Sequence, residues 1–191
     1  MRGYFGIGVE GISKAINAGN LFRSAHAFGA SFTFTVDSKV DLESDLRKSD
    51  TSDSPGQVPY YSFDSVESML LPDRCALVGI ELMDDAVDLP SFRHPRAAAY
   101  VLGMERGSLS PEMVACCDHI VKIPTRFCLN LATAGAVVMY DRQISLGRFA
   151  DRPVVPGGTV EPLPPPVFGA PVWKRKEARR ARRLQEAKSG S

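Results

Sequence analysis

Residues 17–31 read NAGNLFRSAHAFGAS, and this stretch sets the interpretation of the chain around it. Its apolar residues recur at the spacing of one helix face, which predicts an amphipathic helix over about residues 18–28. Asn17 has the side chain of a helix N-cap, and Gly29 is the kind of residue that ends a helix. Arg23 falls on the polar face, where an arginine is usually only a solvated charge. Arg23 by itself therefore indicates no function, and the evidence for one must come from motifs elsewhere in the chain.

Short apolar segments before and after this helix have the composition of β-strands. Continuous apolar runs are typical of parallel strands that are buried on both faces. The alternation of such runs with helical patterns predicts an α/β domain with a mainly parallel sheet over residues 1–150. The expected strands are residues 4–9, 32–36, 75–80, 97–103 and 119–124, and the further expected helices are residues 64–71, capped by Asp64, one that starts at Ser110-Pro111-Glu112, and one that contains residues 129–140.

The remaining segments have compositions that are unusual for a packed core. Residues 37–59 are polar and rich in Ser and Asp, so we expect a mobile loop with a short helix near residues 42–47. Residues 151–173 are rich in proline and predict an extended linker. Residues 174–191 form a basic tail, helical or disordered, in which eight Lys or Arg stand against two Glu. The tail carries a net charge of +6 and leaves −5 on the remaining chain, which favours a polyanionic partner for the tail.

Several classes of protein are disfavoured by the composition. No apolar run reaches the roughly 18 to 20 residues that span a bilayer, so we expect no membrane insertion. The first residues lack the long apolar region of a signal peptide, which favours a cytoplasmic location. The four cysteines form no CxxC pair and the three histidines have no metal-ligand spacing, so we expect reduced, mostly buried thiols and no metal site. No GxGxxG pattern follows the first expected strand and GxxxxGK is absent, which disfavours the common modes of nucleotide binding.

Three motifs, in this order, resemble the SpoU/TrmH family of SPOUT RNA methyltransferases. The first is NAGNLFRSAHAFGA, in which Asn17 and Arg23 are six positions apart. The second is YVLGMERGSLS at residues 100–110, and the third is CLNLATAGAVVMYDR at residues 128–142. The resemblance covers residues 4–142, about three quarters of the chain. It implies an α/β fold with a trefoil knot in its C-terminal part, working as a homodimer.

The resemblance also implies S-adenosylmethionine as the cofactor and a ribose 2′-hydroxyl of RNA as the methyl acceptor. In the family the cofactor binds in the knotted loops, largely through backbone groups. Asn17, Arg23 and Glu105 match the positions that the resemblance assigns to catalysis. The implied cofactor pocket is formed by Leu102, Gly103, Glu105, Ile123, Pro124, Cys128, Leu129 and Asn130.

The role of Arg23 is open between two mechanisms. In the family, the matching arginine is proposed as the base that takes the proton of the 2′-hydroxyl, aided by a phosphate of the substrate. A guanidinium, however, stays protonated far above neutral pH. The second mechanism therefore has Arg23 bind the phosphate in a bidentate manner and stabilise the developing alkoxide.

Three of the matched positions have plainer alternatives. Glu105 also suits a loop or helix-capping carboxylate, and Asn130 suits the N-cap of the last helix. Cys128 stands where the family usually has serine, and a thiol is a weaker hydrogen-bond donor than a hydroxyl. A polar contact at Cys128 would therefore be weakened, and a buried, unreactive thiol is the alternative for this position.

We expect a structured RNA as the substrate, tRNA before rRNA, because compact family members without an added domain often act on tRNA. Arg23 and the basic tail are the expected RNA contacts, since Lys and Arg neutralise phosphates. A disordered, solubilising end is the alternative for the tail. Two other functions stay open: a knotted RNA-binding protein that has lost catalysis, and an RNA base methyltransferase. The tail residues expected to contact RNA are Lys174, Arg175, Lys176, Arg179, Arg180, Arg182 and Arg183.

Overall fold

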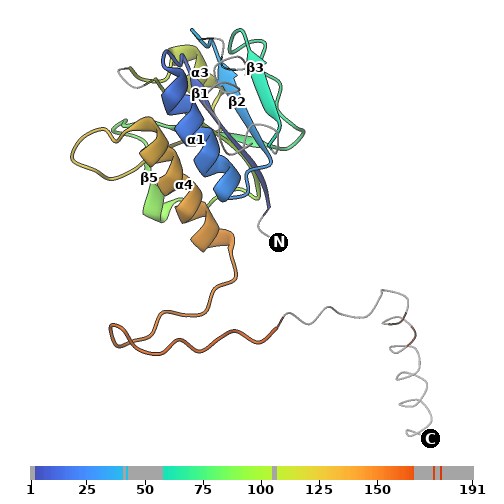
Figure 1. Cartoon of the computed structure of the whole chain (residues 1–191), viewed down its shortest axis with the longest axis vertical. Coiled ribbons are helices and arrows are strands. Elements are labelled where there is room, and N and C mark those ends of the chain that lie inside the picture. The colour runs from blue at the N-terminus through green and yellow to red at the C-terminus, as the bar shows by residue number, and fades with distance from the viewer. Residues whose placement is uncertain are drawn as a thin grey trace, which may run out of the picture. The chain divides into compact units, whose positions relative to one another are not determined.

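The computed structural model describes residues 3–40, 42, 58–104, 107–165, 174 and 177. The chain divides into two units, Met1–Arg148 and Phe149–Ser191 (Figure 1). All of the elements named below belong to the first unit. In the second unit, residues 151–165 form neither helix nor strand, and the basic tail lies outside the described residues apart from Lys174 and Glu177.

A seven-stranded sheet forms the centre of the first unit, in the order β3-β2-β1-β6-β4-β7-β5. Every pairing between the described strands is parallel, which confirms the expected α/β class. The five expected strands are all present. The strands are β1 (Tyr4–Glu10), β2 (Phe32–Val36), β3 (Tyr60–Phe63), β4 (Ala76–Ile80), β5 (Val87–Asp88), β6 (Ala97–Leu102) and β7 (His119–Lys122).

Helices cover both faces of this sheet. Figure 1 shows α1 (Ala15–Ala27) and α4 (Leu131–Leu146) side by side on one face, and the two helices contact each other closely. Their buried side chains pack with the odd-numbered residues of β1 and the even-numbered residues of β6. The opposite face of β6 packs with β2 and with Met113 of α3 (Pro111–Cys116). The sheet is thus the middle layer of three, as its two-sided burial requires.

The start of α1 differs from the expectation. Its N-cap is Lys14, which makes no side-chain cap hydrogen bond. The prediction that Asn17 caps the helix is therefore wrong, because the helix begins at Ala15 and Asn17 already lies within its first turn. The predicted end is confirmed: Gly29 follows the C-cap Phe28 with φ +73°, a left-handed conformation that glycine adopts without strain.

The predicted helix over residues 64–71 is also wrong, since this segment forms bends and turns. Ser65 and Ser68 explain the difference. The Ser65 amide donates to Ser68 Oγ over 3.1 Å, the Ser68 amide donates to Ser65 Oγ over 3.3 Å, and Ser68 Oγ donates to the Ser65 carbonyl over 2.9 Å. Such side-chain bonds offer the backbone an alternative to the helical pattern.

The short strands β3 and β5 were not predicted from the sequence. The loop expected over residues 37–59, with its helix near residues 42–47, lies mostly outside the described residues.

The remaining helix starts agree with the sequence. Ser110 caps α3, because its Oγ accepts the Met113 amide over 3.0 Å. Asn130 caps α4, because its Oδ1 accepts the Ala132 amide over 3.0 Å. None of the described helices combines the length and the apolar character needed to cross a membrane.

Candidate functional site

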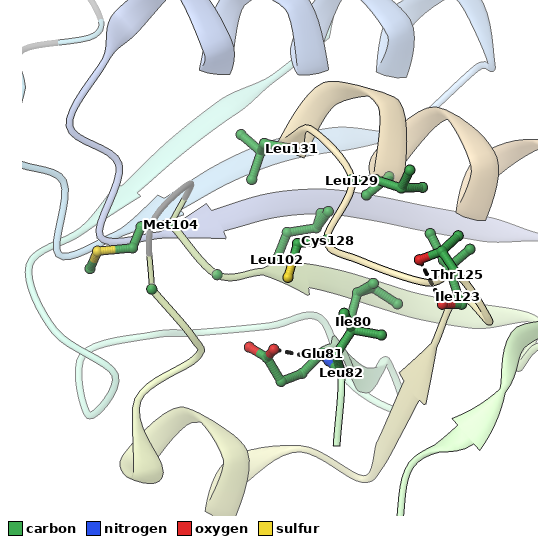
Figure 2. A pocket seen from close by; sticks show the side chains of 13 residues that line it. Ile80, Glu81, Leu82, Leu102, Met104, Ile123, Thr125, Cys128, Leu129 and Leu131 are labelled. Atoms are coloured by element: carbon green, nitrogen blue, oxygen red, sulfur yellow. Dashed lines mark hydrogen bonds between the residues drawn. The ribbon is translucent and has the colours of Figure 1, made fainter. Parts of the chain in front are cut away.

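A cavity of about 190 Å³ opens where β4, β6 and β7 end (Figure 2). These three strands are neighbours in the parallel sheet, so their carboxyl ends meet at one edge, where ligands of open α/β sheets bind. In Figure 2, Leu129 and Leu131 border the cavity on the side of α4, and the end of β4 borders it on the opposite side. The lining residues are Ile80, Glu81, Leu82, Leu102, Gly103, Met104, Gly107, Ile123, Thr125, Cys128, Leu129, Leu131 and Ala134.

The lining is apolar with a few polar groups. Leucine and isoleucine are six of the thirteen described lining residues, and Glu81 is the one charged residue among them. Thr125 Oγ1 donates a hydrogen bond to the Phe127 carbonyl over 2.9 Å, which turns the chain after β7 back toward α4. Apolar walls with a small number of placed polar groups are what small-molecule and cofactor sites have in common.

Described residues between β6 and α3 form one side of the cavity. Gly103, Met104 and Gly107 line it. At Gly103 a Cβ atom would lie 2.9 Å from the Leu109 amide nitrogen, so the close approach of the two backbone segments requires glycine. The Leu109 amide donates to Glu81 Oε2 over 2.8 Å, which joins this segment to the end of β4.

The structure brings together much of the pocket that the resemblance implied. Leu102, Gly103, Ile123, Cys128 and Leu129 all line the cavity. Pro124 and Asn130 do not, although both lie in the same loop, and Asn130 instead caps α4. Glu105 lies outside the described residues, so its role stays a prediction. Cofactor binding by these residues is likewise a prediction.

The sequence reasoning missed the contribution of β4. Ile80, Glu81 and Leu82 were not among the expected pocket residues, yet they form one wall. The sequence contains part of the information needed to predict Glu81 as a pocket residue. Glu81 is acidic and directly follows an apolar run that was expected to be a central parallel strand. Met104, Gly107, Thr125, Leu131 and Ala134 were also missed, although all five lie in or beside the expected motifs.

The two expected catalytic residues of the first motif lie on α1 and are not part of the cavity lining. Arg23 is exposed, and Asn17 is half-buried within the first turn. Asn20 is also exposed, three residues before Arg23, so the two share one helix face. Arg23 is therefore available to a molecule that approaches the outer surface of α1.

A second polar cluster lies inside the protein and was not predicted. Arg142 of α4 is 2% exposed, and it donates to the carbonyls of Pro95 over 2.6 Å and Arg96 over 2.7 Å. It also donates to Tyr100 Oη over 3.0 Å. Its Nε is buried and has no hydrogen-bond partner among the described residues. Because Arg96 immediately precedes β6, Arg142 ties α4 to the edge of the sheet where β6 begins.

His94 continues this cluster. Its Nδ1 lies 2.6 Å from Tyr100 Oη, and its Nε2 lies 2.9 Å from Asp141 Oδ2. Burial, with a smaller contribution from Arg142, lowers the pKa of His94 and outweighs the opposite effect of Asp141. Burial raises the pKa of Tyr100 to about 12. We therefore assign a neutral His94 that accepts from Tyr100 at Nδ1 and donates to Asp141 from Nε2.

The cysteines partly contradict the expectation of buried thiols. All four are free, but Cys116 and Cys128 are exposed, whereas Cys75 and Cys117 are half-buried. Burial raises the pKa of Cys117 to about 12 and also raises the pKa of Cys75, so these two thiols stay protonated. The alternative of a buried Cys128 is thus wrong. Within the described part of the chain, no group of three or more His, Cys, Asp or Glu is placed to hold a metal ion.

Comparisons with known proteins agree with this architecture. The chain resembles the SpoU methyltransferase AviRb from Streptomyces viridochromogenes with a TM-score of 0.64 and 23% identity, over 73% of this chain and 58% of that chain. It resembles the AdoMet-bound rRNA methyltransferase from Sinorhizobium meliloti with a TM-score of 0.66 and 20% identity, over 76% of this chain and 58% of that chain. The chain therefore spans less than two thirds of the length of these two proteins.

A third similar structure comes from work on the 2-OH methylation of C/U34 on tRNA. Its TM-score is 0.63 with 23% identity, over 75% of this chain and 91% of that chain. Comparison with curated protein sequences gives no match. The model of the SpoU rRNA methylase family matches residues 5–140, well over half of the chain. The chain therefore belongs to the SpoU rRNA methylase family.

Proposed function

We propose that this protein is an S-adenosylmethionine-dependent RNA methyltransferase that methylates a ribose 2′-hydroxyl of a structured RNA, with tRNA favoured over rRNA. The observation that carries the proposal is the cavity at the ends of β4, β6 and β7, because it lies where the second and third motifs meet. Family membership supports the reaction class. The AdoMet-bound relative supports the cofactor, and the relative studied for 2-OH methylation on tRNA supports the acceptor.

The described residues fit this cofactor. A purine ring and an aliphatic chain need apolar walls, and Leu102, Ile123 and Leu129 provide them. Gly103 leaves its backbone accessible at the cavity, and the carboxylate of Glu81 favours a ligand with positive charge. S-adenosylmethionine supplies an electrophilic methyl group carried by a sulfonium. The protein's part is then to align the acceptor oxygen with that methyl group and to exclude water.

Arg23 is our proposed residue on the acceptor side. A ribose 2′-hydroxyl is a weak nucleophile and must lose its proton during transfer. We favour the phosphate-binding mechanism, in which the guanidinium of Arg23 holds a substrate phosphate with two parallel hydrogen bonds and stabilises the forming alkoxide. The exposure of Arg23 on α1 suits contact with RNA. Asn17 and Glu105 are proposed to orient the reacting groups.

We further propose the homodimer and the C-terminal trefoil knot that are implied by the family. Val137, Tyr140 and Ile144 support a dimer, since they recur at helical spacing on α4 and are all exposed. A second copy of the chain would bury this apolar face. Residues 1–150 would be the methyltransferase domain, residues 151–173 a linker, and residues 174–191 an RNA-binding tail. We expect the protein to act in the cytoplasm.

The proposal is tested by incubating the full chain with labelled S-adenosylmethionine and either unmodified tRNA or unmodified rRNA, followed by digestion to nucleosides. A labelled 2′-O-methylnucleoside is the expected product, formed from tRNA in higher yield. The Arg23→Ala variant serves as the control for contaminating methyltransferases, because it should give no product.

The other outcomes each favour a different function. A labelled base would indicate an RNA base methyltransferase. RNA binding without any methylated nucleoside would indicate a knotted RNA-binding protein that has lost catalysis. A 2′-O-methylnucleoside formed from rRNA alone would contradict the preference for tRNA but would support the proposed reaction.

A further inference from the structure

Two carboxylates hold residues 107–110, which lie between β6 and α3 and include Gly107 of the cavity lining. Glu81 directly follows β4, and Glu10 is the last residue of β1. Both strands flank β6 in the sheet, so the two carboxylates approach the segment from opposite sides of the strand that precedes it. Neither residue belongs to the three family motifs identified in the sequence.

Glu81 connects two walls of the cavity. Its Oε2 accepts the Leu109 amide over 2.8 Å, and its Oε1 accepts the Leu82 amide over 2.9 Å. Figure 2 shows the second of these bonds beside the end of β4. Both donors are backbone amides, which can donate a hydrogen bond but not accept one. The carboxylate supplies one acceptor oxygen for each amide, whereas the side-chain amide of a glutamine has a single oxygen.

Glu10 makes a similar connection on the other side. It is 7% exposed; its Oε2 accepts the Ser110 amide over 2.9 Å, and its Oε1 accepts the Ser110 hydroxyl over 2.5 Å. The same hydroxyl oxygen accepts the Met113 amide and so caps α3. A buried carboxylate is stable only when it is hydrogen-bonded, so Glu10 and Ser110 depend on each other.

The segment has little freedom to relax if these bonds are lost. The close contact of Gly103 with the backbone of Ser108 and Leu109 places the end of β6 directly against it. A shift of Leu109 would therefore move Gly103 and Gly107, which line the cavity. An amide left without an acceptor in this half-buried place would also destabilise the observed conformation.

We propose that Glu81 and Glu10 are positioning residues that hold residues 107–110 in the conformation needed for cofactor binding. Glu81 is the principal one, because it also lines the cavity. This inference rests on the proposed function only for the identity of the cofactor. The hydrogen bonds themselves are independent of any activity.

The test uses Glu81→Gln in the full chain. Glutamine has the same shape but must turn its NH₂ group toward one of the two amides. We expect the Kd for S-adenosylmethionine, measured by calorimetry, to rise about tenfold. Without cofactor, hydrogen exchange of the Leu109 amide should become about tenfold faster, whereas exchange within β6 stays unchanged. The matched control is Glu112→Gln, because Glu112 is exposed on the neighbouring helix α3 and should leave both values unchanged.

The outcomes separate this inference from the proposed function. If the unsubstituted protein fails to bind S-adenosylmethionine, the cofactor assignment fails, and exchange at Leu109 still decides whether Glu81 holds the segment. If the unsubstituted protein binds and Glu81→Gln binds equally well, the positioning role is overturned. Should Glu81→Gln not fold, Glu10→Gln replaces it, with faster exchange at Ser110 and weaker cofactor binding as the expected results. Unchanged exchange at Ser110 would then overturn the inference.

Discussion

Arg23 offers a way to separate chemistry from cofactor binding, because it is exposed on α1 and does not line the cavity. We expect Arg23→Ala to lower the rate of methyl transfer by at least about 100-fold, the usual loss when a group that stabilises a developing oxyanion is removed. Arg23→Lys should fail as well, since an ammonium lacks the planar fork that binds a phosphate with two hydrogen bonds. Calorimetry should show an unchanged Kd for S-adenosylmethionine in both variants. Full activity of the lysine variant would contradict the phosphate-binding mechanism.

Tyr100 is the centre of the buried polar cluster, and its hydroxyl serves two partners. It accepts from Arg142 and donates to His94, so Tyr100→Phe removes one acceptor of Arg142 and leaves the buried Nδ1 of His94 without a donor. We expect the free energy of unfolding to fall by about 1–3 kcal/mol in urea denaturation. Tyr61→Phe is the matched control, because Tyr61 is 52% exposed and should cause little change. Equal stability of the two variants would show that the cluster contributes nothing measurable.

At the scale of the elements, the sheet was predictable because buried parallel strands are continuous apolar runs. β2 and β6 were predicted to within a residue for this reason. β3 was missed because its sequence, YYSF, is short and half exposed, and so lacks that signature. The start of α1 was misplaced because the prediction relied on the side chain of Asn17, whereas the helix begins without any side-chain cap.

The cavity was predictable mainly where its lining residues belong to one of the three motifs. Gly103 follows an apolar run within the second motif, and Leu129 lies at the start of the third. Glu81 was missed because its place at the cavity depends on β4 lying between β6 and β7. Strand order is a long-range property, and it is not visible in the residues around Glu81.

The attachment of α4 should respond to pH through His94. Its pKa is lowered by burial, so the folded state favours the neutral ring while the unfolded state binds a proton more readily. The free energy of unfolding should therefore decrease as the pH falls below about 6.5, the ordinary pKa of histidine. The groups that face the ring are Tyr100, Asp141 and the aromatic Phe92, with Arg142 acting through space. NMR titration should give a midpoint for His94 below 6.5, and a midpoint above that value would contradict the neutral assignment.

For the whole molecule, the exposed apolar face of α4 predicts the oligomeric state. Ile144→Glu places a charge on the proposed dimer interface, where an unpaired carboxylate would lose its hydration. Light scattering should show twice the monomer mass for the unsubstituted protein and the monomer mass for this variant. Leu70→Glu is the matched control, since Leu70 is 80% exposed in the turns after β3 and should leave the dimer intact. A monomeric unsubstituted protein would contradict the homodimer.

The basic tail predicts that the second unit contributes to RNA binding, whereas the first unit binds the cofactor. Seven Lys and Arg residues between positions 174 and 183 would release counterions from RNA phosphates, so their contribution to RNA affinity should fall steeply with salt. Truncation after Val172 should weaken RNA binding at least about tenfold near 0.1 M salt and flatten the dependence of log K on log salt. The Kd for S-adenosylmethionine should not change, because every described residue that lines the cavity lies in the first unit.

A full-length variant with the seven cations changed to glutamine separates charge from chain length. If phosphate contacts are the reason for the effect, this variant should bind RNA as weakly as the truncated chain. If it binds like the unsubstituted protein, the tail acts through its length or its own folding and not through its charge. If the truncated chain also keeps full affinity, RNA recognition belongs to the first unit alone, and the exposed surface around Arg23 becomes the place to look for it.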